Sequence, residues 1–317
     1  MPIIIRMVLF AFLIAVTLPA YADTTACPPA LQQPAPDMVQ AALHNARDHG
    51  FLWRISKDGR TSYLYGTIHV AKFAWIFPGP QVLRALRSTD TIALEMDMLD
   101  ADIQADLAKG MAALHSMALP ALLEQRMRQQ AAALCVPYDV IANLTPELQV
   151  TTLSITAGRL LGLEASYAID TVLAQIGHDT KKNMVSLESP EMQLRLLQMD
   201  NLQETTAFIE DSLDDLESGR TLQMLEHTAK AWADADYALM ARFDEWCECL
   251  GTAPERELMK RALEQRNPAL AEKIDSLHKN GKQVFAAAGS LHMFGPFGLP
   301  VLMAQRGYRV ERVNFAN

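Results

Sequence analysis

The sequence predicts an α/β protein whose mixed β-sheet is built from both ends of the chain around a large helical insertion. Apolar, β-rich runs occur near the start and near the end of the chain, whereas most segments between them have the apolar spacing of helices. Asp58-Gly59 between the first two runs predicts an antiparallel hairpin. The later strands are connected through helices, so the predicted sheet is mixed.

The first 22 residues are predicted to be a secretory signal peptide. Arg6 supplies a positive charge, Met7–Leu18 is an apolar run, and Ala20-Tyr21-Ala22 is a cleavage site with small residues. An uncleaved membrane anchor is the alternative, but the run is short for a membrane span, and no other stretch is long and apolar enough. We therefore expect an exported protein, periplasmic or extracellular, with no stable membrane insertion after cleavage.

The remaining elements follow in order along the chain. Residues 23–48 are expected to be an N-terminal tail leading into a short helix, and residues 49–317 to be the main domain, with the helical insertion at about 99–265. Strands are expected at Phe51–Ser56, Thr61–Gly66, Thr91–Met96, Asn183–Glu188, Gln283–Ala288 and Tyr308–Val313. Helices are expected at Pro36–Arg47, Pro80–Ser88, Leu99–Ala113, Pro120–Leu134, Pro146–Leu161, Tyr167–Gly177, Pro190–Gln198, Leu202–Glu217, Arg220–Ala233, Ala235–Trp246, Glu255–Gln265, Pro268–Asn280 and Phe297–Arg306.

The negative charge of the chain argues against anionic binding partners. The 317 residues are 50% hydrophobic and 21% charged, and the formal net charge is −9. No basic stripe is available to replace the counterions of phosphates, so a nucleic-acid partner is not expected. An anionic membrane surface is disfavoured for the same reason, and a peptide or a small molecule is the expected substrate.

The four cysteines, Cys27, Cys135, Cys247 and Cys249, are compatible with disulfides in an exported protein. Three pairings are open, and the sequence does not choose among them. Cys247-x-Cys249 is either a tight local bridge or half of a thiolate metal site. A second C-x-C or C-x-x-C pair is absent from the sequence, so a zinc ribbon is not expected.

Two matching G-x-x-H segments follow predicted strands far apart in the chain. They are Gly66-Thr67-Ile68-His69 and Gly289-Ser290-Leu291-His292. A histidine at the end of a strand lies at the carboxyl edge of an α/β sheet, where such folds bind ligands, and the glycine permits a sharp turn or a close approach. Two imidazoles in one site most often bind a metal. Structural histidines at strand ends are the alternative.

Two carboxylates follow the same pattern. Glu95 lies within the apolar strand Thr91–Met96, where a carboxylate must be paired, bound to a metal or neutralised. Asp97 is expected to be a surface or capping residue. Glu188 ends another predicted strand, although Glu188-Ser189-Pro190 is also typical of the start of a helix, where acidic residues are favoured.

Other candidates have an ordinary explanation beside a functional one. Asp170 is early in a predicted helix, where an acid is unsurprising. Asn267 is expected to cap a helix, and Arg266 either belongs to that turn or reaches a carboxylate or the substrate. The remaining histidines are expected to be surface or packing residues. The sequence contains no Gly-rich phosphate loop, G-x-S-x-G or H-E-x-x-H motif.

The chain resembles the TraB/PrgY/GumN family, which includes the animal Tiki proteins. The resemblance is carried by Phe51-Leu52-Trp53, Tyr63–Val70, Leu94-Glu95-Met96-Asp97, Tyr167-Ala168-Ile169-Asp170, Leu187-Glu188 with Gln193, Arg266-Asn267, Gly289–His292 with Gly295, Gly298-Leu299 and Arg306-Gly307-Tyr308. It implies a fold related to the ChaN and erythromycin-esterase group. It also implies a metal-dependent hydrolytic site formed by His69, Glu95 and His292, since Tiki proteins are described as manganese- or cobalt-dependent metalloproteases.

The function that follows from the resemblance is hydrolysis, with peptide bonds as the first expectation. His69 and His292 would hold a divalent metal, and Glu95 would be a third ligand or a nearby base. Asp170, Glu188, Arg266 and Asn267 would orient these groups or bind substrate. Nitrogen and oxygen ligands suit manganese, cobalt or zinc without choosing among them. The alternatives are a peptide-binding or regulatory protein that uses the same pocket without catalysis, and a haem- or iron-binding protein.

The signal peptide generates the first testable prediction. Cleavage after Ala22 produces a mature chain that starts at Asp23 outside the cytoplasm, and loss of Arg6 changes its formal net charge from −9 to −10. N-terminal sequencing of the natively expressed protein checks this. Recovery of intact Met1 in the soluble fraction would contradict it.

Overall fold

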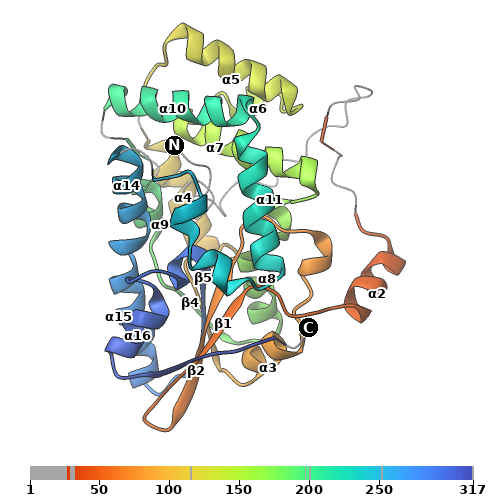
Figure 1. Ribbon diagram of the computed structural model, residues 1–317, viewed down its shortest axis with the longest axis vertical. Coiled ribbons are helices and arrows are strands. Elements are labelled where there is room, and N and C mark those ends of the chain that lie inside the picture. The colour runs from red at the N-terminus through yellow and green to blue at the C-terminus, as the bar shows by residue number, and fades with distance from the viewer. Residues whose placement is uncertain are drawn as a thin grey trace.

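A six-stranded mixed β-sheet forms the base of the protein (Figure 1). The computed structural model describes residues 27–28, 33–114, 116–196, 198–199, 201–250 and 253–315, so the predicted signal peptide lies outside the described residues. The strands are β1 (Phe51–Lys57), β2 (Arg60–Thr67), β3 (Thr91–Leu94), β4 (Asn183–Ser186), β5 (Val284–Gly289) and β6 (Arg309–Arg312). The predicted mixed sheet from both ends of the chain is confirmed, whereas the relation to the ChaN group stays a prediction.

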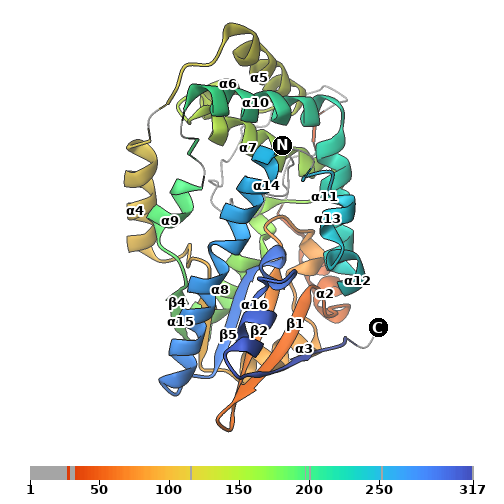
Figure 2. The ribbon, with the colours of Figure 1, turned by 60° about the vertical axis from the view of Figure 1, so that its left-hand side comes forward.

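The strand order β4-β3-β5-β2-β1-β6 brings the carboxyl ends of five strands, all except β1, to one edge of the sheet. Strands β4, β3, β5 and β2 are parallel to one another, and β1 is antiparallel to both β2 and β6. In Figure 2 the β1–β2 turn points away from the helices at the top, so β2 and its parallel neighbours run toward those helices. Strands from the first part of the chain (β2 and β3) and from its last part (β5) therefore end at the same edge, which is where α/β folds bind ligands.

The hairpin and the central strands have clear causes in the sequence. Asp58 and Gly59 form the two-residue turn with φ of 49° and 74°, and positive φ at both positions matches the twist of a tight hairpin. Every residue of β3 and of β5 is buried. Continuous apolar strands of this kind belong in the middle of a parallel sheet that helices cover on both faces.

Helices supply the rest of the described structure. They are α2 (Pro36–His44), α3 (Pro80–Arg87), α4 (Ala101–Ala112), α5 (Ala121–Ala133), α6 (Tyr138–Ile141), α7 (Pro146–Ala157), α8 (Ile169–Asp179), α9 (Pro190–Arg195), α10 (Leu202–Glu217), α11 (Arg220–Ala233), α12 (Tyr237–Met240), α13 (Phe243–Trp246), α14 (Ala253–Met259), α15 (Asn267–Lys279) and α16 (Leu299–Gln305). Short 3₁₀ turns occur at Phe73–Trp75, Gly158–Leu161, Ala165–Tyr167 and Ser290–Met293, and a π-helical turn at Lys260–Glu264. Within the described ranges, none of these helices has the length and apolarity that a bilayer span requires.

The described part of the chain forms two hydrophobic cores. The larger one surrounds the sheet, and the smaller one lies among α5, α7 and α10, which gather at the top of both views (Figures 1 and 2). Met127 of α5, Leu153 of α7 and Ile209 of α10 are completely buried in the smaller core. The helical segment between β3 and β5 thus buries apolar surface of its own in addition to covering the sheet.

One predicted helix is wrong as a single element. The segment 235–246 forms two short helices, α12 and α13, because Asp236 caps a new start at Tyr237 and the backbone leaves helical geometry at Arg242. The Tyr237 hydroxyl accepts a hydrogen bond from the amide of Leu52 at 2.7 Å, which ties α12 to strand β1. A tertiary contact of this kind has no signature in local apolar spacing.

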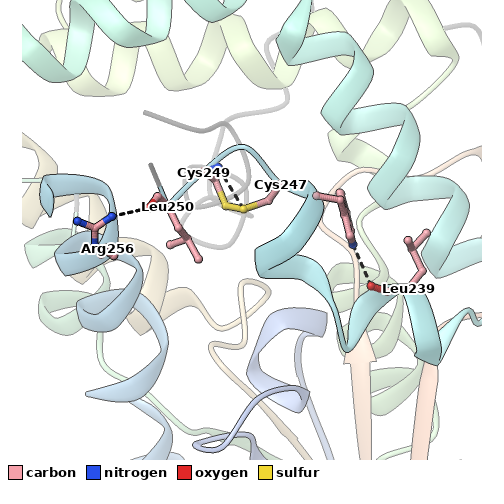
Figure 3. Close-up of a disulfide and its surroundings, with 6 residues drawn as sticks. Leu239, Cys247, Cys249, Leu250 and Arg256 are labelled. Atoms are coloured by element: carbon pink, nitrogen blue, oxygen red, sulfur yellow. Dashed lines mark hydrogen bonds between the residues drawn. A yellow bond between two sulfur atoms is a disulfide. The ribbon is translucent and has the colours of Figure 1, made fainter. Parts of the chain in front are cut away.

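The disulfides are Cys27–Cys135 and Cys247–Cys249. The second is the local bridge of the two alternatives for Cys247-x-Cys249, and Figure 3 shows it in the turn that leads toward α14. Glu248 between the two cysteines has φ of 49°, and the amide of Cys249 donates to Cys247 Sγ at 3.2 Å. Both cysteines are buried in the larger core, so neither thiol is a free metal ligand.

Gly79 provides a stability prediction for the fold. Asp48 accepts hydrogen bonds from the amides of Gln81 and Val82 at the start of α3, and a Cβ on Gly79 would lie 2.1 Å from the amide nitrogen of Asp48. Gly79→Ala must therefore move the backbone. We expect the free energy of unfolding to fall by about 1–3 kcal/mol in urea denaturation.

Gly110→Ala is the matched control for this substitution. Its added carbon would meet only the end of the flexible Leu194 side chain, at 2.3 Å, and a helix interior gains about 1 kcal/mol when Gly becomes Ala. The net change should be small. Equal destabilisation by the two substitutions would contradict the assigned role of Gly79.

Candidate functional site

The two histidines of the G-x-x-H segments meet at the carboxyl edge of the sheet. His69 lies two residues beyond β2, and His292 lies in the 3₁₀ turn Ser290–Met293 that follows β5. Because β2 and β5 are adjacent and parallel, the two segments end side by side. His69 is 7% exposed and His292 is fully buried. The two histidines therefore lie at equivalent positions, just beyond the ends of neighbouring parallel strands.

Each imidazole is oriented by an oxygen acceptor at Nδ1. His69 Nδ1 lies 2.8 Å from Asp170 Oδ2, and His292 Nδ1 lies 2.5 Å from Asn267 Oδ1. The Asn267 amide nitrogen donates to the carbonyl of Phe297 at 2.7 Å, so its oxygen is left to accept from His292. In the neutral form both rings then carry hydrogen on Nδ1 and a lone pair on Nε2.

Both Nε2 atoms are buried and lack a hydrogen-bond partner. His292 Nε2 lies 3.8 Å from Glu95 Oε1, and that same carboxylate oxygen accepts the amide of Gly289 at 2.6 Å. A Cβ on Gly289 would lie 3.1 Å from His69 Nε2 and 3.5 Å from Glu95 Oε1. Glycine at this position therefore leaves room for His69 Nε2 and the carboxylate oxygen of Glu95.

Glu95 lies just past the end of β3 instead of within the strand, which corrects the predicted strand Thr91–Met96. The backbone pairing with the next chain segment nevertheless continues, because the Glu188 amide donates to the Glu95 carbonyl at 2.8 Å. This pairing holds the two glutamates next to each other beyond the sheet. Asp97 does not join them: it is 3% exposed and bonded to His178 Nε2 at 2.8 Å. Of the two expectations for Asp97, the surface residue is wrong, whereas its side chain does accept the backbone amide of Leu99 at 3.1 Å, as a capping residue does.

Arg266 forms ion pairs with both glutamates. Its guanidinium donates to Glu95 Oε2 at 2.9 Å and to Glu188 Oε1 at 2.7 Å, and Nη2 makes a further bond to Glu188 Oε2. Gln193 donates to Glu188 at 2.5 Å and to Glu95 at 3.3 Å. The remaining guanidinium nitrogen, Nη1, donates to the carbonyl of Ala262 within the π-helical turn. All four polar side chains are buried.

The two histidines have opposite electrostatic properties. Burial lowers the pKa of His292 to about 3, since the attraction of Glu95 is too small to offset it, so this imidazole is neutral at pH 7. Burial also disfavours the charged form of His69, but the charge and hydrogen bond of Asp170 outweigh it and raise the pKa of His69.

Glu95 is charged at neutral pH. Burial opposes the carboxylate, but the nearby His292, Arg266 and His69 and the amide of Gly289 lower the pKa of Glu95 to about 2. The pKa of Glu188 is raised, because burial outweighs its bonds to Arg266. Formally, the carboxylates of Glu95 and Glu188 share one guanidinium, and a third carboxylate, of Asp170, bonds to His69. This excess of negative charge suits a cation.

The donor set fits a divalent cation in chemistry but does not form a complete ligand group. Two free imidazole nitrogens and one carboxylate oxygen are of the type that binds manganese, cobalt or zinc. Across the described ranges, however, no group of three or more His, Cys, Asp or Glu side chains is arranged to hold a metal ion. The residues present would hold a cation through His69 and His292, with Glu95 as the nearest oxygen donor.

All the predicted site residues lie in this cluster, and some have unexpected partners. Asn267 is the first residue of α15 and orients His292, so the expected helix-capping role is wrong. Sequence analysis missed Thr67, whose hydroxyl donates to Asp170 Oδ1 at 2.7 Å, and gave Gln193 no role. Thr67 belongs to the G-x-x-H segment itself, and Gln193 follows Glu188 in the next helix. Their closeness in sequence to these motifs is the signal that could have identified them.

The fold and site define an α/β protein with two histidines and a paired glutamate at the carboxyl edge of a mixed sheet. The family model of the TraB/PrgY/gumN family matches residues 51–312, and the chain belongs to this family. It is 25% identical over 260 residues to "Uncharacterized protein YbaP" of Shigella flexneri and of Escherichia coli (strain K12). Each match covers 77% of this chain and 88% of the relative. No solved structure matches the chain.

The Arg266 cluster generates a stability prediction. Arg266→Met leaves two buried carboxylates without their cation, so the free energy of unfolding should fall by about 3–5 kcal/mol. The double variant Arg266→Met with Glu188→Gln should lose less, because one of the buried charges is also removed. Urea denaturation measures both values.

Arg54→Met is the control for the Arg266 substitution. Arg54 pairs with Glu311 at 2.6 Å, but the two side chains are 50% and 31% exposed. Its loss should cost at most about 1 kcal/mol, as for other exposed ion pairs. A loss at Arg266 no larger than that at Arg54 would show that the buried cluster is not a major determinant of stability.

Proposed function

We propose that the protein is an exported hydrolase that uses a divalent metal, held by His69 and His292, to cleave peptide bonds. The observation that supports this most strongly is the pair of buried Nε2 atoms without hydrogen-bond partners. An unpaired buried polar atom is costly. Here His292 Nε2 lies 3.8 Å from Glu95 Oε1, and His69 Nε2 and the same oxygen both lie next to Gly289. A cation at this point would satisfy both nitrogens at once.

The residues around the histidines have separate roles in this proposal. Asp170 fixes the ring of His69 and is itself held by the Thr67 hydroxyl, and Asn267 fixes the ring of His292. Such outer partners set which nitrogen is free for a ligand. A bound divalent metal would supply Lewis acidity, lowering the pKa of water and polarising a carbonyl.

The electrostatics favour one of the two predicted roles of Glu95. A general base works best with a pKa near the operating pH, and a pKa of about 2 is far below it. In this arrangement Glu95 is better suited to contribute an oxygen ligand or a fixed negative charge than to remove a proton. Arg266 and the Gly289 amide, which both bind the carboxylate, keep it ionised.

The substrate class and the location are proposed on other grounds. Peptide bonds follow from the resemblance to the Tiki metalloproteases, because the relatives identified for this chain are uncharacterised. Export follows from the signal-like pattern at residues 1–22. Manganese, cobalt and zinc all fit the nitrogen and oxygen donors, so the metal is left open among the three.

A peptide-binding protein without catalysis is the second candidate. It is favoured by the satisfied state of Glu95, which already accepts hydrogen bonds from Gly289, Arg266 and Gln193 without any metal. Metal analysis of the purified protein distinguishes the two proposals, since only the hydrolase requires a bound divalent metal.

Substitutions of the proposed ligands test the function. His69→Ala and His292→Ala should each abolish stoichiometric metal binding and peptide hydrolysis, because a site that loses one of two imidazoles holds a metal weakly. Glu95→Gln should reduce metal affinity if Glu95 is a ligand; if Glu95 is a base, metal should stay bound while turnover falls by about 10²–10⁴-fold. Metal content by mass spectrometry and cleavage of a peptide library are the measurements.

His44→Ala is the control for the histidine substitutions, because His44 is an exposed residue of α2. It should change neither metal content nor activity. Thermal melts should show that all variants fold. If His69→Ala and His292→Ala keep full metal content while folded, the metal site lies elsewhere.

A further inference from the structure

A small cavity lies beside His69, between the helical part of the protein and the ends of the strands. It has a volume of about 30 Å³, and its surface is almost entirely apolar. Thr228 and Trp232 of α11 and Met240 of α12 form one wall. The other lining residues are Phe51, Thr67, Ile68, His69, Gly289, Ser290 and Leu291. The cavity therefore borders His69, whose Nε2 is unpaired, and Gly289, whose amide donates to Glu95.

Most polar side chains in the cavity wall are already paired. The Thr67 hydroxyl donates to Asp170, the Ser290 hydroxyl to the Thr67 carbonyl at 2.7 Å, and the Trp232 indole to the Gly66 carbonyl at 2.9 Å. Among the side-chain nitrogen and oxygen atoms of the lining residues, two have no partner. They are His69 Nε2, which would coordinate the proposed metal, and Thr228 Oγ1.

The free hydroxyl of Thr228 departs from the behaviour of other buried or half-buried hydroxyls in helices of this chain. Thr152 and Ser154 of α7 donate to the carbonyl four residues earlier, at 2.7 and 2.9 Å, as helical Thr and Ser commonly do. Thr228 is only 9% exposed, yet its hydroxyl makes no such bond. A buried unpaired hydroxyl costs about 1–3 kcal/mol, and a ligand in the cavity can recover that cost.

We propose that this cavity binds a small apolar side chain of a peptide substrate, and that the Thr228 hydroxyl hydrogen-bonds the adjoining peptide group. The proposal deepens the hydrolase function proposed above and, as far as the substrate is concerned, rests on it. A water molecule needs about 10–15 Å³ of such space, so the cavity has room for a few non-hydrogen atoms. An alanine or valine side chain fits this space, and an aromatic side chain does not.

The test uses N-acetyl-L-alanine methylamide as a probe of binding that needs neither metal nor turnover. The indole N–H signal of Trp232, in the cavity wall, is followed by NMR in protein labelled with ¹⁵N-tryptophan. We expect a saturable shift in the wild-type protein and a much weaker one with N-acetyl-L-tryptophan methylamide. Thr228→Val, which removes only the hydroxyl and keeps the shape, should raise Kd by about 3- to 10-fold.

Two variants complete the design. Thr228→Ser keeps the hydroxyl and should bind the probe more tightly than Thr228→Val. Thr152→Val removes a hydroxyl that is already paired within its own helix and should leave Kd unchanged. The proposal is overturned if the alanine probe gives no saturable shift, or if Thr228→Val binds it as well as the wild type.

The outcome is independent of the metal site. If the purified protein binds no divalent metal but the alanine probe titrates as expected, the cavity is a peptide pocket and the hydrolase proposal alone fails. If metal binding and hydrolysis are found without probe binding or a preference for small apolar residues, the hydrolase stands and the cavity proposal fails.

Discussion

The buried guanidinium of Arg266 is the interaction on which the rest of the site depends. Glu95 and Glu188 extend from the adjacent ends of β3 and β4, where two carboxylates cannot both be buried without a cation. Arg266 precedes α15 directly, so one planar group joins two strand ends to one helix. The π-helical turn before it supplies the Ala262 carbonyl that fixes the remaining guanidinium nitrogen. Strand ends, helix and charge balance are therefore linked through one side chain.

The two histidines look equivalent in sequence but differ in chemistry because their acceptors differ. Asp170 is a carboxylate and makes His69 hold a proton more tightly, whereas Asn267 is a neutral amide and does nothing to offset the burial of His292. His292 thus presents a lone pair over the whole neutral range. At His69 an incoming cation competes with a proton. The two matching motifs therefore supply one imidazole that stays neutral around pH 7 and one whose free lone pair is lost when the ring is protonated.

The sequence was sufficient for the features that depend on local pattern. The Asp58-Gly59 hairpin and the apolar parallel strands follow from turn chemistry and from periodicity, and the alignment of His69 with His292 follows from parallel strand ends. The features that failed depend on contacts across the fold. The break near Arg242 accompanies the contact of Tyr237 with β1, and the two disulfide pairings required the folded chain.

Within the candidate site, too, residues with a local signal were identified, and the roles of residues that depend on long-range contacts were missed. Glu95 was identified because a carboxylate next to an apolar strand is locally anomalous. Asn267 was assigned to helix capping because its partner, His292, is 25 residues away and no local signal connects them. Gln193 carries no anomaly in sequence, although it bridges both glutamates. A residue that supports other functional groups looks ordinary until its neighbours are known.

Because the two hydrophobic cores are separate, part of the helical bundle can open locally without moving the residues of the site. Helices α8 and α9, which carry Asp170 and Gln193, contribute Ile169, Leu173 and Leu194 to the core around the sheet and none to the smaller core. The buried apolar residues of α5 and α10 all belong to the smaller core. Local opening of these two helices would therefore leave the donors of the site in place, because cooperative units of a protein open at different free energies. Helices α5 and α10 can fluctuate, or change their surface during evolution, while the edge of the sheet keeps its arrangement.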